Sequence, residues 1–137
     1  MDSIILDSSF LIALEVGTDQ NHEKAEKALE KILEGALGET IISDYIFDEI
    51  VTVTFLKTKD LEKAIFLGEK IKQSAKMIKI DAALFDSAWN IFKEQTNTKM
   101  SFTDCTNIAI MQSSKIKNIA TFDKDFEKIK EINVISN

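Results

Sequence analysis

Residues 3–14, SIILDSSFLIAL, begin with a short apolar run, continue with one aspartate and then take the spacing of a helix. The run SIIL has the length and composition of a buried strand. The same order recurs along the chain, with strand-like runs at 39–43, 76–80, 118–122 and 132–136 and helical segments between them. Strands that alternate with helices predict an α/β fold of three layers, with a mostly parallel central sheet between two layers of helices.

Helical spacing of apolar residues predicts the elements between the strands. Helices are expected at about 8–16, 21–34, 42–55, 60–74, 81–95 and 101–114, with a short helical turn at 124–130. The sequence has no proline and only 4 glycines, so the helices must end through caps and short turns. Gly35 and Gly38 are expected to end the second helix, and Asp60 to cap the fourth. A chain of 137 residues without repeats or linkers predicts one domain over 1–137.

The cysteine and histidine content excludes several kinds of site. Cys105 is the only cysteine and His22 the only histidine, which excludes disulfide frameworks and zinc sites built from several such ligands. A Ser-His-Asp triad could use only His22, which lies in a polar stretch at a helix start. We interpret His22 as a surface or helix-packing residue, and a small polar role near the site stays open.

Hydropathy gives no sign of a membrane segment. No apolar run approaches the roughly 18 residues that a spanning helix needs, and Asp2 and Asp7 flank the first apolar run. A signal peptide is therefore not expected at this position. The sequence predicts a cytoplasmic protein without membrane contact.

The charge balance bears on nucleic acid as a partner. The net charge is −6, and all 17 basic residues are lysines. Phosphate binding is driven by clustered positive charge, so scattered acids would argue against nucleic acid. Acids that bind divalent cations would instead leave the local charge less negative. The question is therefore whether the acids converge.

Two aspartates follow strand-like runs directly. Asp7 comes after SIIL and Asp123 after NIATF, so a parallel sheet places both at the edge formed by the carboxyl ends of its strands. Ligands bind at this edge in open α/β sheets. Either aspartate could also be a simple helix cap, which is the commoner role of an isolated aspartate after a strand.

Two further acids lie on helices. In ISDYIFDEIVTVTF (42–55), Glu49 falls on the apolar side near Val53 and is expected to face the interior or a cleft, whereas Asp48 lies about 100° away and is better solvated. A salt bridge to a lysine would be the structural alternative for Glu49. In SFTDCTNIAIM (101–111), Asp104 fits a capping box with Ser101 and also projects beside the apolar stripe. Both roles can hold for Asp104.

Four converging carboxylates predict a particular chemistry. Without cations they would repel one another and their pKa values would rise. Oxygen-only ligands suit magnesium or manganese. The matching reaction is phosphodiester hydrolysis, with one ion activating a water and a possible second stabilising the leaving oxygen. Thr103 or Thr121 could orient a carboxylate by a hydrogen bond.

Four segments together resemble the PIN domain family, the nuclease module found in toxins of the VapBC type. They are ILDSSFLIAL, ISDYIFDEIV, SFTDCTNIAIM and IATFDKDF, in that order along the chain. The resemblance implies a catalytic, metal-binding quartet with Asp7 and Asp104 as the most direct ligands. It also implies a serine hydroxyl beside the first acid and one accessory acid. The residues are Asp7, Glu49, Asp104 and Asp123 for the quartet, Ser8 or Ser9 for the hydroxyl, and Asp125 for the accessory acid.

The resemblance further implies a Mg²⁺- or Mn²⁺-dependent endoribonuclease, the VapC-type toxin of a type II toxin-antitoxin pair. Such a protein is expected to form a homodimer and to bind a small antitoxin that covers the acidic cleft. Surplus apolar positions in FLIALEV and LEKAIFLGEKI agree with a partner, although core packing explains most of them. An RNA-processing PIN nuclease outside a toxin system and a non-catalytic interaction module stay open as alternatives.

Other phosphate chemistries fit less well. A phosphatase with an aspartyl nucleophile would have a second aspartate two residues after Asp7, where this chain has Ser9. The chain also lacks the glycine-rich motifs G-x-x-x-x-G-K-[ST] and G-x-G-x-x-G, which argues against nucleotide switches and dinucleotide enzymes.

Overall fold

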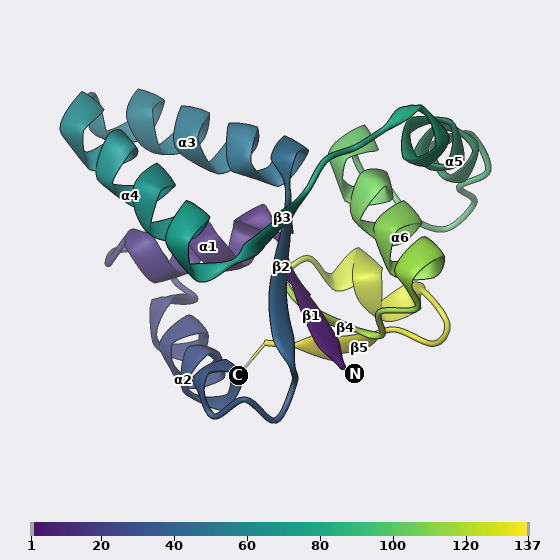
Figure 1. Ribbon diagram of the computed structural model, residues 1–137, viewed down its shortest axis with the longest axis horizontal. Helices are drawn as coiled ribbons and strands as arrows, with labels where there is room; N and C mark the ends of the chain where they lie inside the picture. Colours follow the sequence, from purple (N-terminus) through teal and green to yellow (C-terminus); the bar gives the residue numbers. More distant parts are fainter. Residues whose placement is uncertain (1, 137) are drawn as a thin grey trace.

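A computed structural model of the protein describes residues 2–136 and contains one parallel sheet (Figure 1). Its strands follow the order β3-β2-β1-β4-β5, and every neighbouring pair is parallel. The five strands confirm all five expected runs; they are β1 (Ser3–Leu6), β2 (Glu39–Ser43), β3 (Lys76–Ile78), β4 (Asn118–Ala120) and β5 (Asn133–Ile135).

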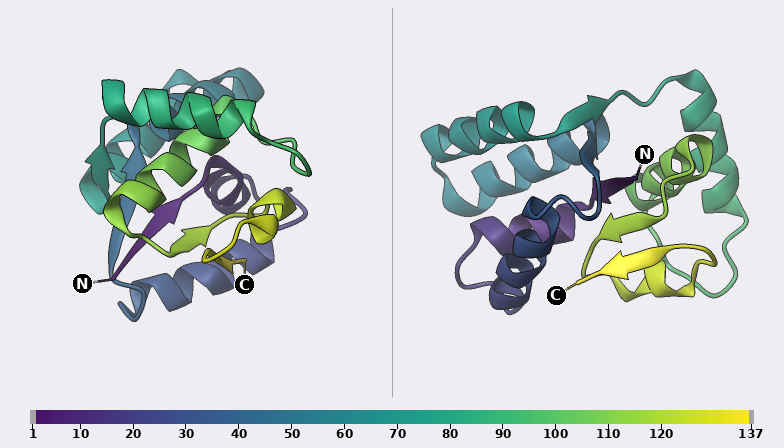
Figure 2. Two further views of the ribbon diagram at one scale, coloured as in Figure 1. Left: turned by 90° about the vertical axis from the view of Figure 1, so that its right-hand side faces the viewer. Right: turned by 60° about the horizontal axis from the view of Figure 1, so that its bottom comes forward.

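Helices cover both faces of this sheet, which confirms the three-layer α/β/α prediction (Figure 2). The first four helices pack on one face, whereas the last two helices and a 3-10 helix pack on the other. The elements are α1 (Ser8–Glu15), α2 (His22–Leu33), α3 (Asp44–Thr58), α4 (Leu61–Ser74), α5 (Ala82–Lys93), α6 (Phe102–Ser114) and the 3-10 helix η1 (Lys124–Lys128).

Side-chain alternation along β1 explains the two cores. Ile4 and Leu6 contribute to the core beneath α1 to α4, whereas Ile5 contributes to the core beneath α5 and α6. Both faces of the central strand are therefore apolar, as is usual for a parallel strand covered on two sides.

Polar side chains fix where the helices begin. Ser43 accepts a hydrogen bond from the Ile46 N–H at the start of α3, and Asp60 and Asp81 do the same at the starts of α4 and α5. The α3 helix begins at Asp44, two residues after the expected start, because Ile42 and Ser43 pair with β3. The β3 strand ends at Ile78, because the Ile80 N–H instead donates to the Asp44 carboxylate (2.9 Å).

Within residues 2–136, no helix combines the length and the hydropathy that crossing a bilayer requires.

Candidate active site

The sheet order brings two acids together at one edge. β1 is the central strand. β2 and β3 lie on one side of it and β4 and β5 on the other, so β1 and β4 form the point where the strand order changes side. Asp7 leaves the end of β1, where its N–H donates to the Ala120 carbonyl at the end of β4 (3.0 Å). Asp123 follows β4 three residues later. The two carboxylates therefore start from neighbouring strand ends.

Asp7 is a buried carboxylate with one satisfied oxygen. Its side chain is 2% exposed, and its Oδ2 accepts hydrogen bonds from the Thr121 hydroxyl (2.7 Å) and the Ser9 hydroxyl (2.9 Å). Its Oδ1 is buried without a hydrogen-bond partner. Burial raises the pKa of Asp7 despite the two bonds. Asp7 occupies the N-cap position of α1, yet its side chain makes no capping bond, so capping does not explain this residue.

The hydroxyl beside Asp7 belongs to Ser9. The sequence allowed Ser8 or Ser9, and Ser8 contributes to the Asp7 carboxylate only through its backbone. Ser9 Oγ also accepts a bond from the Phe122 N–H (3.0 Å) and lies 3.2 Å from Thr121 Oγ1. Thr121 is thus one of the two side chains that fix the orientation of Asp7.

Asp104 lies in the first turn of α6 and has both of the roles considered for it. Ser101 and Asp104 form a reciprocal capping box, with both bonds at 3.1 Å. Burial, together with the charges of Asp7 and Asp123, raises the pKa of Asp104 to about 7. A cap exposed to water would not show this shift, so Asp104 faces the other acids.

Glu49 lies on the side of α3 that faces this group. Its charge contributes to the raised pKa of Asp7, and its side chain is half-buried, whereas Asp48 is exposed as expected. Glu49 and Thr103 line one cleft of about 520 Å³, together with other residues of α3. Thr103, one of the two threonines expected to orient a carboxylate, thus lies at the wall of this cleft.

Asp123 combines a cap with proximity to Asp104. Its Oδ1 accepts a bond from the Asp125 N–H (2.9 Å) at the start of η1, and its own N–H donates to Thr121 Oγ1 (3.0 Å). Its charge also contributes to the pKa of Asp104. Thr121 therefore connects the backbone of one acid with the carboxylate of another.

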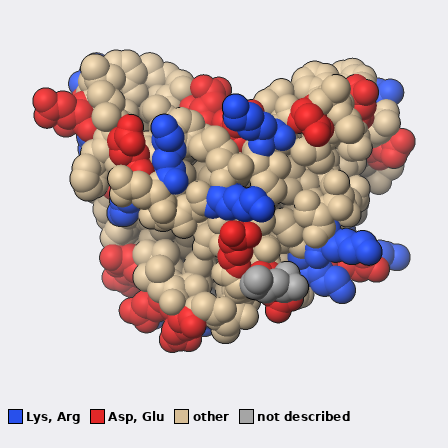
Figure 3. Space-filling model, in the orientation of Figure 1, with Lys and Arg blue, Asp and Glu red and all other residues tan. Residues whose placement is uncertain are grey.

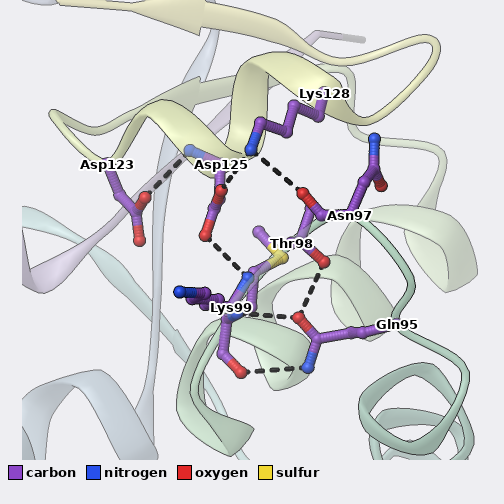
Figure 4. A network of polar contacts seen from close by, with 8 residues as sticks. Gln95, Asn97, Thr98, Lys99, Asp123, Asp125 and Lys128 are labelled. Carbon is purple, nitrogen blue, oxygen red and sulfur yellow. Dashed lines mark hydrogen bonds and ion pairs between the residues drawn. The ribbon is translucent and has the colours of Figure 1, made fainter.

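The Asp125 side chain is held by the segment before α6 and by Lys128. Its Oδ2 accepts a hydrogen bond from the Lys99 N–H (2.9 Å), and its Oδ1 lies 3.1 Å from Lys128 Nζ. Figure 4 shows this carboxylate turned toward the segment before α6. The bond from the Lys99 backbone and the contact with Lys128 lower the pKa of Asp125. Asp125 thus ties η1 to the segment that leads into Ser101 and Asp104.

Removal of this tie should loosen the segment between α5 and α6. We expect Asp125→Ala to destabilise the protein, because the Lys99 N–H loses its acceptor. Asp125→Asn retains an acceptor and loses only the exposed ion pair, so its effect should be much smaller. Urea unfolding of both variants measures this difference. Equal losses would mean that the charge, not the bond to Lys99, holds the segment.

His22 has the packing role expected for it. Its Nδ1 lies 2.8 Å from the Ala13 carbonyl oxygen, and its Nε2 lies 3.4 Å from a Glu26 carboxylate oxygen. His22 therefore ties the start of α2 to α1.

Asn107 was missed by the sequence reasoning. It lies one turn after Asp104 on α6, is fully buried, and has no hydrogen-bond partner for either side-chain polar atom. Its signal in the sequence is an amide next to the apolar run 108–111, on a helix whose other residues near Asp104 are mostly buried. A buried amide of this kind needs a water or another polar group to satisfy it.

Residues 4–132 match the family described as PIN domain. The chain belongs to the PIN domain family. This PIN domain is 26% identical over 148 residues to Ribonuclease VapC6 of Methanocaldococcus jannaschii, and the alignment covers 97% of this chain and 96% of that protein.

Solved structures of other proteins share the fold of this PIN domain. VapC20 of Mycobacterium tuberculosis, a sarcin-ricin loop cleaving toxin, superposes with a TM-score of 0.78 at 23% identity, covering 91% of this chain and 93% of that chain. VapBC2 of Rickettsia felis, bound to a DNA fragment from its promoter, gives a TM-score of 0.73 at 12% identity and 96% coverage of both chains. These similarities confirm the three-layer arrangement.

The donor set of this PIN domain fits a hard divalent cation. Among residues 2–136, no three side chains of His, Cys, Asp or Glu are gathered closely enough to enclose a metal ion. Mg²⁺ commonly keeps several waters and uses only one or two carboxylates. The unpartnered Asp7 Oδ1 is a buried acceptor that a cation would satisfy, and the neighbouring acids that raise the pKa of Asp104 would repel one another less around a cation. Asp7 and Asp104 are the residues that would hold such a cation directly.

The raised pKa of Asp104 gives the metal-free PIN domain a distinctive dependence on pH. The value is 3.8 in the unfolded reference and about 7 in the folded protein. The folded state binds the Asp104 proton more tightly than the unfolded state does. The contribution of this proton to the free energy of unfolding is therefore complete below about pH 4 and is lost as the pH rises through about 7. We expect the melting temperature in chelator to fall between pH 5 and pH 7.5, and to fall less in Asp104→Asn. If the melting temperatures of wild type and Asp104→Asn change with pH in parallel, the raised pKa of Asp104 is contradicted.

Proposed function

We propose that this PIN domain is a Mg²⁺- or Mn²⁺-dependent endoribonuclease whose site consists of Asp7, Glu49, Asp104 and Asp123. The observation that carries the proposal is the buried Asp7 carboxylate, which keeps one oxygen unpartnered and interacts with Asp104 and Glu49. The relative named Ribonuclease VapC6 supports the choice of RNA, since its similarity extends over nearly the full length of both chains.

The residues around Asp7 would prepare it for a cation. Thr121 and Ser9 hold Oδ2 and so fix the direction of Oδ1, the oxygen that is left for the ion. Such an ion would lower the pKa of a bound water and neutralise charge on the phosphodiester. Asp104 would be the second direct ligand, held in place by its capping box with Ser101. Glu49, at the cleft wall, would orient the attacking water.

We further propose that the protein is a toxin that acts in the cytoplasm, forms a homodimer and binds a small antitoxin. The similarity to the VapBC2 structure supports the antitoxin as a partner. A largely apolar groove of about 420 Å³ runs between α1, α2 and α4, with Phe10, Leu14, Leu29 and Leu67 among its lining residues. An antitoxin segment in this groove could extend a basic side chain toward the acids.

Cleavage of a structured RNA tests the nuclease proposal. Wild type, Asp104→Asn and Glu69→Gln are compared with Mn²⁺, with Mg²⁺ and with chelator. Asp104→Asn keeps an acceptor for the capping box, so circular dichroism should show an intact fold. Glu69→Gln makes the same charge change on the exposed surface of α4. Metal-dependent cleavage that only Asp104→Asn loses supports the proposal. Wild type that is inert with every ion would favour the non-catalytic module. Equal cleavage by all three proteins would mean that Asp104 is not part of the site or that the activity belongs to a contaminant.

A further inference from the structure

We propose that Asn107 is a positioning residue of the acidic site, whose buried amide holds the Asp7 carboxylate in place through a hydrogen-bonded water. This role rests on the proposed nuclease function, since Asp7 is a residue that would hold the cation. It assigns a task to a side chain that neither capping nor core packing explains.

Asp7 and Asn107 are both buried with unsatisfied polar atoms. Within residues 2–136, the buried side-chain polar atoms that lack a hydrogen-bond partner are Asp7 Oδ1 and the Nδ2 and Oδ1 atoms of Asn107. Asp7 is 2% exposed and Asn107 is 0% exposed. Other buried polar side chains, such as Ser43 and Thr121, form hydrogen bonds. An unsatisfied buried polar group costs stability, so each of the two needs a partner.

Asn107 lies on the side of α6 that faces the acids. Successive residues of an α-helix are rotated by about 100°, so the direction of Asn107 falls between the directions of Thr103 and Asp104. Thr103 lines the acidic cleft, and the charge of Asp7 contributes to the raised pKa of Asp104. The Asn107 amide is therefore on the same side as both, one helical turn further from the start of α6.

The Asp7 side chain is on the face of the sheet that α6 covers. Ile5 of β1 packs in the same core as Ile108, the residue after Asn107. The backbone is still extended at Asp7 (φ −91°, ψ 156°), so alternation along the strand places Asp7 on the same face as Ile5. The carboxylate and the amide thus approach the site from the sheet and from the helix that covers it.

Both groups lie behind the surface of the acidic cleft. Glu49 of α3 and Thr103 of α6 line this cleft. Figure 1 shows the starts of α3 and α6 near each other, and Figure 3 shows a notch between the α3–α4 part and the α5–α6 part of the surface. Because Asp7 and Asn107 are buried, bulk solvent does not satisfy them, and an internal water is the partner that fits.

One water can satisfy the carboxylate and the amide together. A water that accepts a hydrogen bond from Asn107 Nδ2 can donate one to Asp7 Oδ1, and buried waters commonly make about three such bonds. A carboxylate oxygen has two lone pairs, so Asp7 Oδ1 can accept this bond and still bind a cation. The water neutralises no charge, so a cation still stabilises Asp7.

The proposed bond completes the support of the Asp7 carboxylate. Thr121 and Ser9 hold Oδ2 by direct bonds, and Asn107 would hold Oδ1 through the water. Groups that hydrogen-bond to a metal ligand commonly change metal affinity by about 10–100-fold. Asn107 is therefore expected to affect cation binding without contacting the cation.

A double-mutant cycle tests the link between Asn107 and Asp7. Wild type, Asn107→Leu, Asp7→Asn and the double variant are melted in chelator. Asn107→Leu should lower the melting temperature by about 4 °C more in wild type than in Asp7→Asn, because hydrogen bonds to a charged group are stronger. Asn107→Ala takes its place in the cycle if the leucine variant does not fold.

Cation affinity gives the second measurement. Asn107→Leu should weaken Mn²⁺ binding about tenfold in isothermal titration calorimetry. Thr106→Val is the matched control, because Thr106 is also fully buried on α6 and its hydroxyl bonds to the Thr103 carbonyl within the helix. The control should bind Mn²⁺ like wild type.

Two results would overturn the role of Asn107. One is a cycle in which the melting shifts add. The other is Mn²⁺ affinity that is equal in Asn107→Leu and Thr106→Val, which would make Asn107 a packing residue. The cycle needs no cation and so separates the two proposals. Additive shifts in a protein that cleaves RNA remove only Asn107, whereas coupled shifts in a protein that neither binds Mn²⁺ nor cleaves RNA retain the link and remove the nuclease.

Discussion

Replacing Asp7 with asparagine is expected to abolish RNA cleavage and, in chelator, to raise the melting temperature. The two effects have one cause. The Asp7 carboxylate is buried with an unpartnered oxygen, so its charge costs stability whenever no cation is bound. An asparagine retains an acceptor for Thr121 and Ser9 and carries no charge. We expect a gain of about 1–2 kcal/mol in the metal-free protein.

The loss of activity in Asp7→Asn should be large. Removal of a group that stabilises developing charge in a transition state commonly costs about 10²–10³-fold in rate. Mn²⁺ should raise the melting temperature of wild type by mass action and leave that of Asp7→Asn unchanged. Thermal melting with Mn²⁺ and with chelator, alongside the cleavage assay, measures both effects. A lower melting temperature for Asp7→Asn in chelator would show that the carboxylate is satisfied without a cation.

Replacing Gly38 with alanine is expected to be the most destabilising small substitution in the chain's turns. The φ angle of Gly38 is +84°, and a Cβ atom there would lie 1.8 Å from the Asp2 carbonyl oxygen. That oxygen accepts the Glu39 N–H (3.1 Å) where β1 and β2 begin. Relief of the clash would separate the two strands at their starts. The left-handed backbone and the overpacking together should cost about 2–5 kcal/mol.

Gly35 provides the matched comparison for Gly38. Its φ angle is +82°, and no other atom lies within 4 Å of the position that a Cβ would occupy. Gly35→Ala should therefore cost only the backbone term, about 1–2 kcal/mol. Urea unfolding gives the free energy of unfolding of both variants. The difference between their losses measures the cost of the clash between the added Cβ atom and Asp2. If both variants lose equal stability, the Asp2 segment moves aside without cost.

Local patterns in the sequence predicted most of the fold. Buried strands such as Ser3–Leu6 are short apolar runs, and helix starts such as Asp60 and Ser101 carry their own capping side chains. Both signals depend on residues close together in the chain. The order of strands in the sheet does not, because five similar runs do not say which of them are neighbours. The central position of β1 was therefore open until the structure placed it between β2 and β4.

The sequence predicted which acids belong to the candidate site, but it did not predict the hydrogen bonds that these acids form. Asp7 and Asp123 follow strands, so a parallel sheet alone brings them to one edge. The choice of Ser9 over Ser8 depends on the direction in which α1 leaves the strand. The turning of Asp125 toward Lys99 depends on a loop distant in sequence. Neither contact has a signature in neighbouring residues.

The position of β1 also affects how the protein reaches its folded state. The hydrogen bond between Thr121 and Asp7 joins residues 114 positions apart, whereas the pairing of β1 with β2 closes a much shorter loop. Long-range pairings of parallel strands form slowly, because chain entropy is lost before the contacts are gained. The α1–α4 side, with β1 and β2, can thus collapse before β4 arrives. The carboxylates of Asp7 and Asp123 meet only when this last pairing closes, so recovery of the site during refolding would follow the slowest phase.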